Sequence, residues 1–127
     1  MRDSRHRRGA CGEAIAALFL ESRGYVVLAR NLRAGRREID LVVERGATLV
    51  AVEVKWRSTS SLGVGAVEAW RPAQRSRTAL AILLSRDAFP GGATRPWRLD
   101  LVTLDECPDG FRLVHRPGAA APGGSWW

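Results

Sequence analysis

The chain is poor in lysine and cysteine and has no long apolar segment. Lysine occurs once among the 127 residues, at Lys55, and the other 19 basic residues are arginines. The two cysteines, Cys11 and Cys107, form no CxxC pair and imply no disulfide framework, so we expect a reducing, cytoplasmic setting. No apolar run approaches the roughly 20 residues that a membrane helix needs. No signal-peptide pattern follows the basic N-terminus. These features argue against a disulfide scaffold and a membrane span.

The composition is that of a globular protein with an excess of positive charge. Hydrophobic residues make up 46% of the chain and charged residues 26%, and the formal net charge is +7. This charge favours an anionic partner, with nucleic acid first, although an arginine-rich composition alone also makes a chain basic. We expect a single domain over residues 9–116, a flexible basic arm over residues 1–8 and a disordered tail over residues 117–127.

The spacing of apolar residues predicts two helices and five strands. The helices are expected over residues 9–23 and 70–88, and the strands over residues 25–32, 37–44, 47–56, 97–104 and 111–115. A helix between the third and fourth strands permits a parallel crossover. The sequence therefore predicts an α/β fold, with a mixed central β-sheet of about five strands flanked by helices.

Three charged residues interrupt the apolar second and third strands. Asp40 lies in the run Ile-Asp-Leu-Val-Val, and Glu53 and Lys55 lie in the run Val-Glu-Val-Lys. Because side chains alternate along a strand, Glu53 and Lys55 share one face. A turn centred between Arg45 and Gly46 leaves Asp40 diagonal to Glu53, whereas a turn centred between Gly46 and Ala47 places the two opposite each other. Both registers put the two carboxylates on the same face.

Two carboxylates side by side on a sheet repel each other, and a divalent cation would compensate the repulsion. Oxygen-only ligands suit Mg²⁺ or Mn²⁺, which activate water and polarise phosphoryl oxygens. Lys55 lies about 7 Å further along the strand than Glu53, where it can orient the water or stabilise developing charge. The pattern therefore predicts a metal-dependent nuclease site. The alternative is an ordinary surface pair of Glu53 and Lys55.

A larger set of motifs resembles the YraN-like family of small bacterial proteins. That family is regarded as distantly related to archaeal Holliday-junction resolvases within the PD-(D/E)XK nuclease superfamily, so the resemblance implies a restriction-endonuclease-like core. The matching motifs are Gly9-x-x-Gly12-Glu13-x-x-Ala16, Gly24-Tyr25, Arg30-Asn31-x-Arg33, Glu38-Ile39-Asp40-Leu41-Val42, Val52-Glu53-Val54-Lys55-x-Arg57 and Arg98-Leu99-Asp100-Leu101-Val102.

The resemblance also implies roles for individual residues. Asp40 and Glu53 would bind the metal, Lys55 would be catalytic, and Glu13 would be a further acidic member of the site. From the residues alone, Glu13 is an exposed carboxylate near a helix start, and Glu38 is a solvated charge or a structural partner. Because resolvases of this kind cut symmetric junctions as dimers, the resemblance also implies a homodimer.

Two positions depart from the family pattern. Arg37 stands where the family usually has glycine, and Gln74 stands where a lysine is expected early in the second helix. Further basic residues near the predicted site would line a path for a DNA backbone, or else form a solvated arginine face. The predicted DNA-contacting residues are Arg33, Arg36, Arg37, Arg57, Arg71, Gln74 and Arg75.

The sequence thus predicts a Mg²⁺- or Mn²⁺-dependent endonuclease that hydrolyses DNA phosphodiester bonds, including those of branched or structured DNA. The alternative is a basic nucleic-acid-binding or adaptor module that keeps the nuclease fold without cutting. The first hypothesis predicts sensitivity to substitution at Asp40 and Glu53. The second predicts tolerance there and sensitivity at the arginines.

Overall fold

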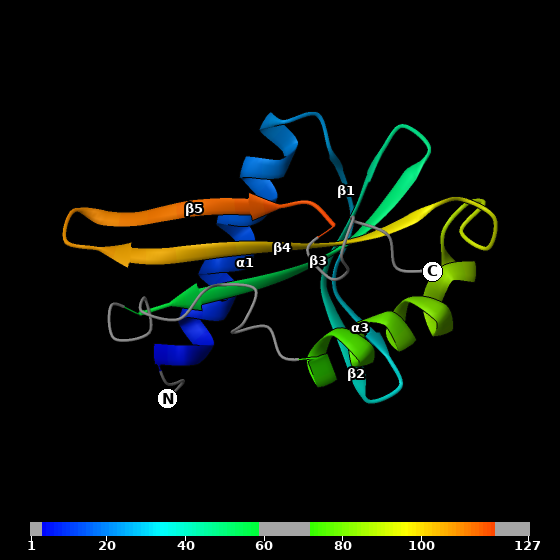
Figure 1. Ribbon diagram of the computed structural model, residues 1–127, viewed down its shortest axis with the longest axis horizontal. Helices are drawn as coiled ribbons and strands as arrows, with labels where there is room; N and C mark the ends of the chain where they lie inside the picture. The colour runs from blue at the N-terminus through cyan, green and yellow to red at the C-terminus, as the bar shows by residue number, and fades with distance from the viewer. Residues whose placement is uncertain (1–3, 59–71, 119–127) are drawn as a thin grey trace.

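The computed structural model describes residues 4–58 and 72–118, which form a five-stranded sheet with helices on both sides (Figure 1). The strands follow the chain in the order β1-β2-β3-β4-β5. The β3–β4 pair is parallel and the other three pairs are antiparallel. The elements are α1 (Ser4–Ser22), β1 (Val26–Ala34), β2 (Arg37–Arg45), β3 (Thr48–Arg57), α3 (Pro72–Ser85), the short 3₁₀ helix η2 (Arg86–Ala88), β4 (Trp97–Cys107) and β5 (Gly110–Arg116). The predicted mixed α/β sheet is confirmed.

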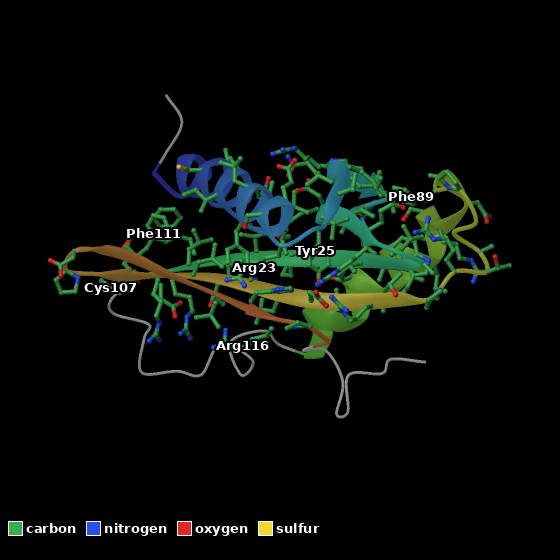
Figure 2. All side chains as sticks on the ribbon, turned by 90° about the horizontal axis from the view of Figure 1, so that it is seen from above. Arg23, Tyr25, Phe89, Cys107, Phe111 and Arg116 are labelled. Atoms are coloured by element: carbon green, nitrogen blue, oxygen red, sulfur yellow. The ribbon has the colours of Figure 1, made fainter. Side chains whose placement is uncertain are left out.

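The two helices cover opposite faces of the sheet and create two hydrophobic cores. Figure 2 shows α1, in blue, on one side of the sheet and α3, in green, on the other. Ala16, Ala17 and Leu20 of α1 pack against one face, in a cluster that we call the α1-side core. Ala81 and Ile82 of α3 pack against the other face, in the α3-side core. Among the described residues no helix combines the length and the apolar character needed to cross a bilayer.

The boundaries of the domain differ from those predicted. The helix α1 begins at Ser4 rather than at Gly9, so residues 4–8 belong to the helix and not to a separate arm. Arginine is a good helix former, and a single glycine inside a helix costs only about 1 kcal/mol. At the other end, the backbone N–H of Gly118 donates to the carboxylate of Asp100 at 2.9 Å, which joins residues 117–118 to the domain. Residues 1–3, 59–71 and 119–127, including the predicted start of the second helix at residue 70, lie outside the described part.

The β1–β2 hairpin changes direction where Asn31 lies opposite Asp40. Asn31 has a φ of 51°, in the left-handed region that asparagine tolerates better than most residues. The residues on both sides of this point are paired across the hairpin, whereas Asn31 and Asp40 themselves are not. Ile39 and Val42 are an odd number of residues apart, yet both pack in the α3-side core. A regular strand would direct them to opposite faces, so the strand turns at Asp40.

Candidate metal centre

The β2–β3 pairing places Asp40 opposite Glu53. Leu41 pairs with Val52, and the same register runs back to the turn, where Gly46 has a φ of 59°. This is the register centred between residues 46 and 47, one of the two that the sequence left open. One step further along it, Asp40 faces Glu53, where the recorded pairing of the two strands ends.

Three polar side chains, those of Asp40, Glu53 and Lys55, come together at this point. The backbone N–H of Val54 donates a hydrogen bond of 2.8 Å to Oδ2 of Asp40, and the carboxyls of Asp40 and Glu53 share a hydrogen bond. The ammonium of Lys55 lies 3.5 Å from Oε1 of Glu53. The side chains of Lys55 and Glu53 are 27% and 17% exposed, so both are sheltered while remaining in contact with solvent. The structure therefore gathers the aspartate, the glutamate and the lysine of the predicted site.

Two further glutamates approach Asp40 from α1 and β2. Carboxylate oxygens of Glu13, Glu38 and Asp40 all lie within 4.8 Å of one another, a grouping that could hold a metal ion. Glu38 also lies 3.9 Å from the guanidinium of Arg33. The sequence predicted Glu38 to be a solvated charge or a structural partner and did not predict that it would join this acidic group. Its position two residues before Asp40, on the same face, was the available signal.

The position of Glu13 depends on a close approach between α1 and the sheet. Gly12 is buried, and a Cβ added there would lie 3.4 Å from the side chain of Trp56 on β3. A Cβ there would just reach van der Waals contact, so only side-chain atoms beyond Cβ would press on the tryptophan. The side chain of Asn31 forms a hydrogen bond with Glu13. Asn31 thus bends the hairpin and also holds this glutamate, a role that sequence reasoning missed.

The electrostatics show a concentration of acidic groups, which the described residues compensate only in part. Burial and the neighbouring charge of Asp40 raise the pKa of Glu53 to about 7, and the same two causes raise the pKa of Glu13 to about 7. Burial also raises the pKa of Asp40, against the opposing effects of the Val54 N–H and the Lys55 charge. Carboxylates crowded in this way supply the all-oxygen ligand set that Mg²⁺ and Mn²⁺ prefer. The residues therefore fit a hard divalent cation.

Comparison with known proteins places this chain in a family. The model of the family described as "Uncharacterised protein family UPF0102" matches residues 12–104, which include every residue of the candidate centre. The chain belongs to UPF0102. The resemblance to the YraN-like family is thereby confirmed.

Relatives of this UPF0102 chain occur in several bacteria. A UPF0102 protein of Methylorubrum extorquens strain PA1 is 43% identical over 93 residues, covering 73% of this chain and 72% of the relative. The UPF0102 protein STH1475 of Symbiobacterium thermophilum is 39% identical over 104 residues, covering 82% and 86%. Among solved structures, SfsA of Pyrococcus furiosus in complex with Ca²⁺ aligns with a TM-score of 0.42 at 15% identity. The alignment covers 91% of this chain and 63% of that chain.

The arginines predicted to contact DNA have different environments in the UPF0102 structure. Arg33 and Arg36 are exposed on the β1–β2 hairpin. Arg37 is half-buried, and its Nε has no hydrogen-bond partner in the described part of the chain. Arg57 is only 11% exposed and binds Asp105 through two hydrogen bonds of 2.8 and 3.1 Å, so its guanidinium is engaged within the sheet. Arg71 lies outside the described residues, as do the side chains of Gln74 and Arg75.

A second buried carboxylate, Asp100 on β4, lies apart from the acidic group and is fully paired. It is completely buried and accepts two hydrogen bonds from Arg98, at 2.7 and 2.8 Å. Nε2 of His115 lies 2.7 Å from Oδ2 of Asp100, and the N–H of Gly118 donates to Oδ1. Arg98 also donates to the hydroxyl of Tyr25 at 2.7 Å. Although burial raises the pKa of Asp100, the hydrogen bonds from His115, Arg98 and Gly118 hold it below its usual value. This network ties Tyr25, which directly precedes β1, to β4 and β5.

Proposed function

We propose that this UPF0102 protein is a metal-dependent endonuclease of the PD-(D/E)XK type that hydrolyses DNA phosphodiester bonds, with branched or structured DNA as its substrate class. The observation that carries the proposal is the contact between Asp40, Glu53 and Lys55. Two carboxyls share a hydrogen bond, their pKa values are raised, and one ammonium lies 3.5 Å from the second of them. Perturbed groups clustered in this way are typical of catalytic sites.

Asp40, Glu53 and Glu13 would hold the metal, Mg²⁺ or Mn²⁺. A divalent cation bound by carboxylates polarises a phosphoryl oxygen and lowers the pKa of a bound water. Glu38 lies close enough to Asp40 and Glu13 to join the ligand set. The four carboxylates come from α1, β2 and β3, so the centre depends on the packing of the helix against the sheet.

The chain's own residues hold the reacting groups in place. The Val54 N–H fixes the carboxylate of Asp40, and Asn31 fixes that of Glu13. Glu53 holds the ammonium of Lys55, which would donate a hydrogen bond to the attacking water or to a non-bridging phosphate oxygen. The water oxygen bonds to phosphorus and releases a proton to solvent as the bond to the leaving sugar oxygen breaks, and the leaving oxygen takes a proton from solvent. The positive charge of Lys55 would offset the negative charge that develops on the phosphoryl oxygens.

The partner proposed for this reaction is DNA, consistent with the formal charge of +7. A homodimer, which the resemblance to junction resolvases implies, stays a prediction. It would place two centres on the two strands of a symmetric junction. Gel filtration and cross-linking with and without a four-way junction would measure it.

The test is cleavage of labelled duplex, single-stranded, flap and four-way-junction DNA with Mg²⁺ or Mn²⁺ and with EDTA. We expect metal-dependent cutting that falls about 100-fold or more in Asp40→Asn and in Lys55→Ala. Glu21→Gln is the matched control, because it also turns a carboxylate into an amide but lies exposed on α1 outside the acidic group. Cutting that survives both Asp40→Asn and Lys55→Ala would overturn the proposed site. Salt-sensitive binding without any cutting would support the non-catalytic binding module.

A further inference from the structure

The face of the sheet that carries Glu53 and Lys55 continues across β4 to β5. Leu49 and Ala51 of β3 pack in the α3-side core, so Glu53 and Lys55, which follow at two-residue spacing, point to the same side. On β4, Leu101 packs in that core as well. Residues paired across neighbouring strands share a face, which allows the side of each β4 and β5 residue to be assigned.

The β5 residues on this face include two arginines. Leu101 pairs with Arg116, and Asp105 pairs with Arg112. Figure 2 shows Arg116 on the side of the sheet opposite α1. The helix α3 packs mainly on β1 and β2, so in the described part of the chain no helix covers the β5 end of this face. We call Arg112 and Arg116 the β5 arginine pair.

The strand between the metal centre and β5 is polar where it meets these arginines. Thr103 and Asp105 of β4 are buried, although the preceding residues of β4 on this face, Trp97, Leu99 and Leu101, are apolar. Nη1 of Arg116 donates to Oγ1 of Thr103 at 3.1 Å, which fixes the stem of that arginine against the sheet. Arg57 engages both oxygens of Asp105, and Arg112 lies 3.9 Å from the same carboxylate.

The β5 arginine pair therefore keeps unused binding capacity. Both Asp105 oxygens are already taken by Arg57, so the weak contact leaves Arg112 73% exposed. In the part of the chain that the structure describes, Arg116 has one hydroxyl partner and, beyond ion-pair distance, a charge interaction with Asp105. A guanidinium has five N–H donors, and one hydrogen bond leaves most of them available.

We infer that the β5 arginine pair binds the phosphate backbone of the DNA whose scissile phosphate lies at Glu53 and Lys55. Two strand spacings separate β3 from β5, about 10 Å, which corresponds to roughly three nucleotide steps along a DNA strand. Arg57, at the end of β3, adds no net positive charge between the two sites, because Asp105 of β4 neutralises it. The bound backbone thus contacts the protein at the metal centre and again at β5. This inference rests on the proposed function, since it takes DNA as the substrate.

The test compares two double variants that remove the same charge from opposite faces of the sheet. Arg112→Gln/Arg116→Gln removes the β5 arginine pair. Arg23→Gln/Arg45→Gln is the matched control, because these exposed arginines lie over Phe19 and Tyr25 on the α1 side. Binding of a fluorescent four-way junction and of its component duplex is measured by anisotropy in EDTA, over a series of salt concentrations. Binding is thereby measured without cleavage.

We expect the β5 double variant to bind about tenfold more weakly than wild type near 0.1 M salt. The slope of log affinity against log salt should become shallower by about two, one for each lost phosphate contact. The α1-side control should keep the wild-type slope and bind within about threefold of wild type. Equal losses in both double variants would show that only total charge matters and would overturn the inference. So would a β5 variant that binds like wild type.

A single variant distinguishes a loss of DNA binding from a loss of folding. Replacing Arg116 removes its hydrogen bond to Thr103 and so affects the sheet itself. Arg112→Gln alone removes only an exposed group and should reduce the slope by about one. Failure of that single variant to change the slope would count against the inference even if the double variant unfolded. A wild type that cuts DNA while the β5 variants bind normally would refute the inference and leave the proposed function standing. Binding through β5 without any cutting would support DNA binding by the β5 arginine pair and count against the proposed function.

Discussion

Two groups of buried carboxylates lie on the same sheet and differ in how their charge is compensated. Asp100 on β4 is completely buried, yet four hydrogen bonds from Arg98, His115 and Gly118 hold its pKa below the usual value. Asp40 and Glu53 are less buried, and their pKa values are raised. The nearest ammonium is the single Lys55, and the nearest other acids are two more glutamates.

The difference shows that burial of a carboxylate does not by itself mark a functional site. Asp100 has as many donors as it can use, which makes it a structural tie between strands. The acidic group around Asp40 has more acceptor oxygens than the donors and cations seen around it in the described part of the chain, which is typical of a site completed by a ligand. Replacing a carboxylate by an amide should therefore lower the free energy of unfolding strongly at Asp100 and change it little at Asp40.

The largest effect on stability is expected for Asp100→Asn. The amide cannot pair with both Arg98 and His115 and presents an NH₂ group to their donors, so the free energy of unfolding should fall by about 3 kcal/mol. Urea denaturation followed by circular dichroism would measure it. Asp109→Asn in the exposed β4–β5 turn is the control and should change stability by less than about 0.5 kcal/mol. An equally small change in the free energy of unfolding for Asp100→Asn would show that Asp100 is not a structural tie between the strands.

A smaller effect on stability is expected for Asp40→Asn, together with the loss of stabilisation by Mg²⁺. The Asn side-chain oxygen can still accept the Val54 N–H, and the substitution removes one of the repelling charges, so metal-free stability should stay within about 1 kcal/mol of wild type. Mg²⁺ at about ten times its Kd should stabilise the wild type by about 1.4 kcal/mol and leave Asp40→Asn unchanged.

The thermal unfolding temperature with and without Mg²⁺ measures this difference. Asp100→Asn should keep the wild-type response to Mg²⁺, because Asp100 lies outside the acidic group. Equal stabilisation of wild type and Asp40→Asn by Mg²⁺ would show that the cation binds elsewhere.

The smallest effect is expected in the pH dependence of stability. The folded protein holds the pKa of Asp100 below its unfolded value, so its contribution is complete above the unfolded pKa of about 4 and is lost as the pH falls through the folded pKa. The gap in unfolding free energy between wild type and Asp100→Asn should therefore narrow, by about 1 kcal/mol or more, as the pH is lowered from 5 to about 3. A gap that stays constant over this range would mean that ion pairing does not stabilise Asp100.

The fold was largely predictable because its elements have strong local patterns. Valine-rich runs and glycine turns predict the five strands to within a few residues, and alternation along β3 assigns Glu53 and Lys55 to one face. The start of α1 was harder to place, because a polar arginine-rich turn has no apolar periodicity to mark it. The bend at Asn31 was missed, since one asparagine in a strand shows no sign of a left-handed backbone until its neighbours are in place.

The sequence by itself determined that an aspartate, a glutamate and the only lysine share a strand hairpin, because a period of two and a glycine turn leave few alternatives. The tertiary structure decided which register the hairpin adopts and that Glu13 and Glu38 join Asp40. It also decided the environment of Arg57. The parallel β3–β4 pairing brings Asp105 beside Arg57, whose guanidinium is ion-paired and largely buried. Such contacts join residues far apart in the chain, and no local pattern encodes which partner a charged side chain will meet.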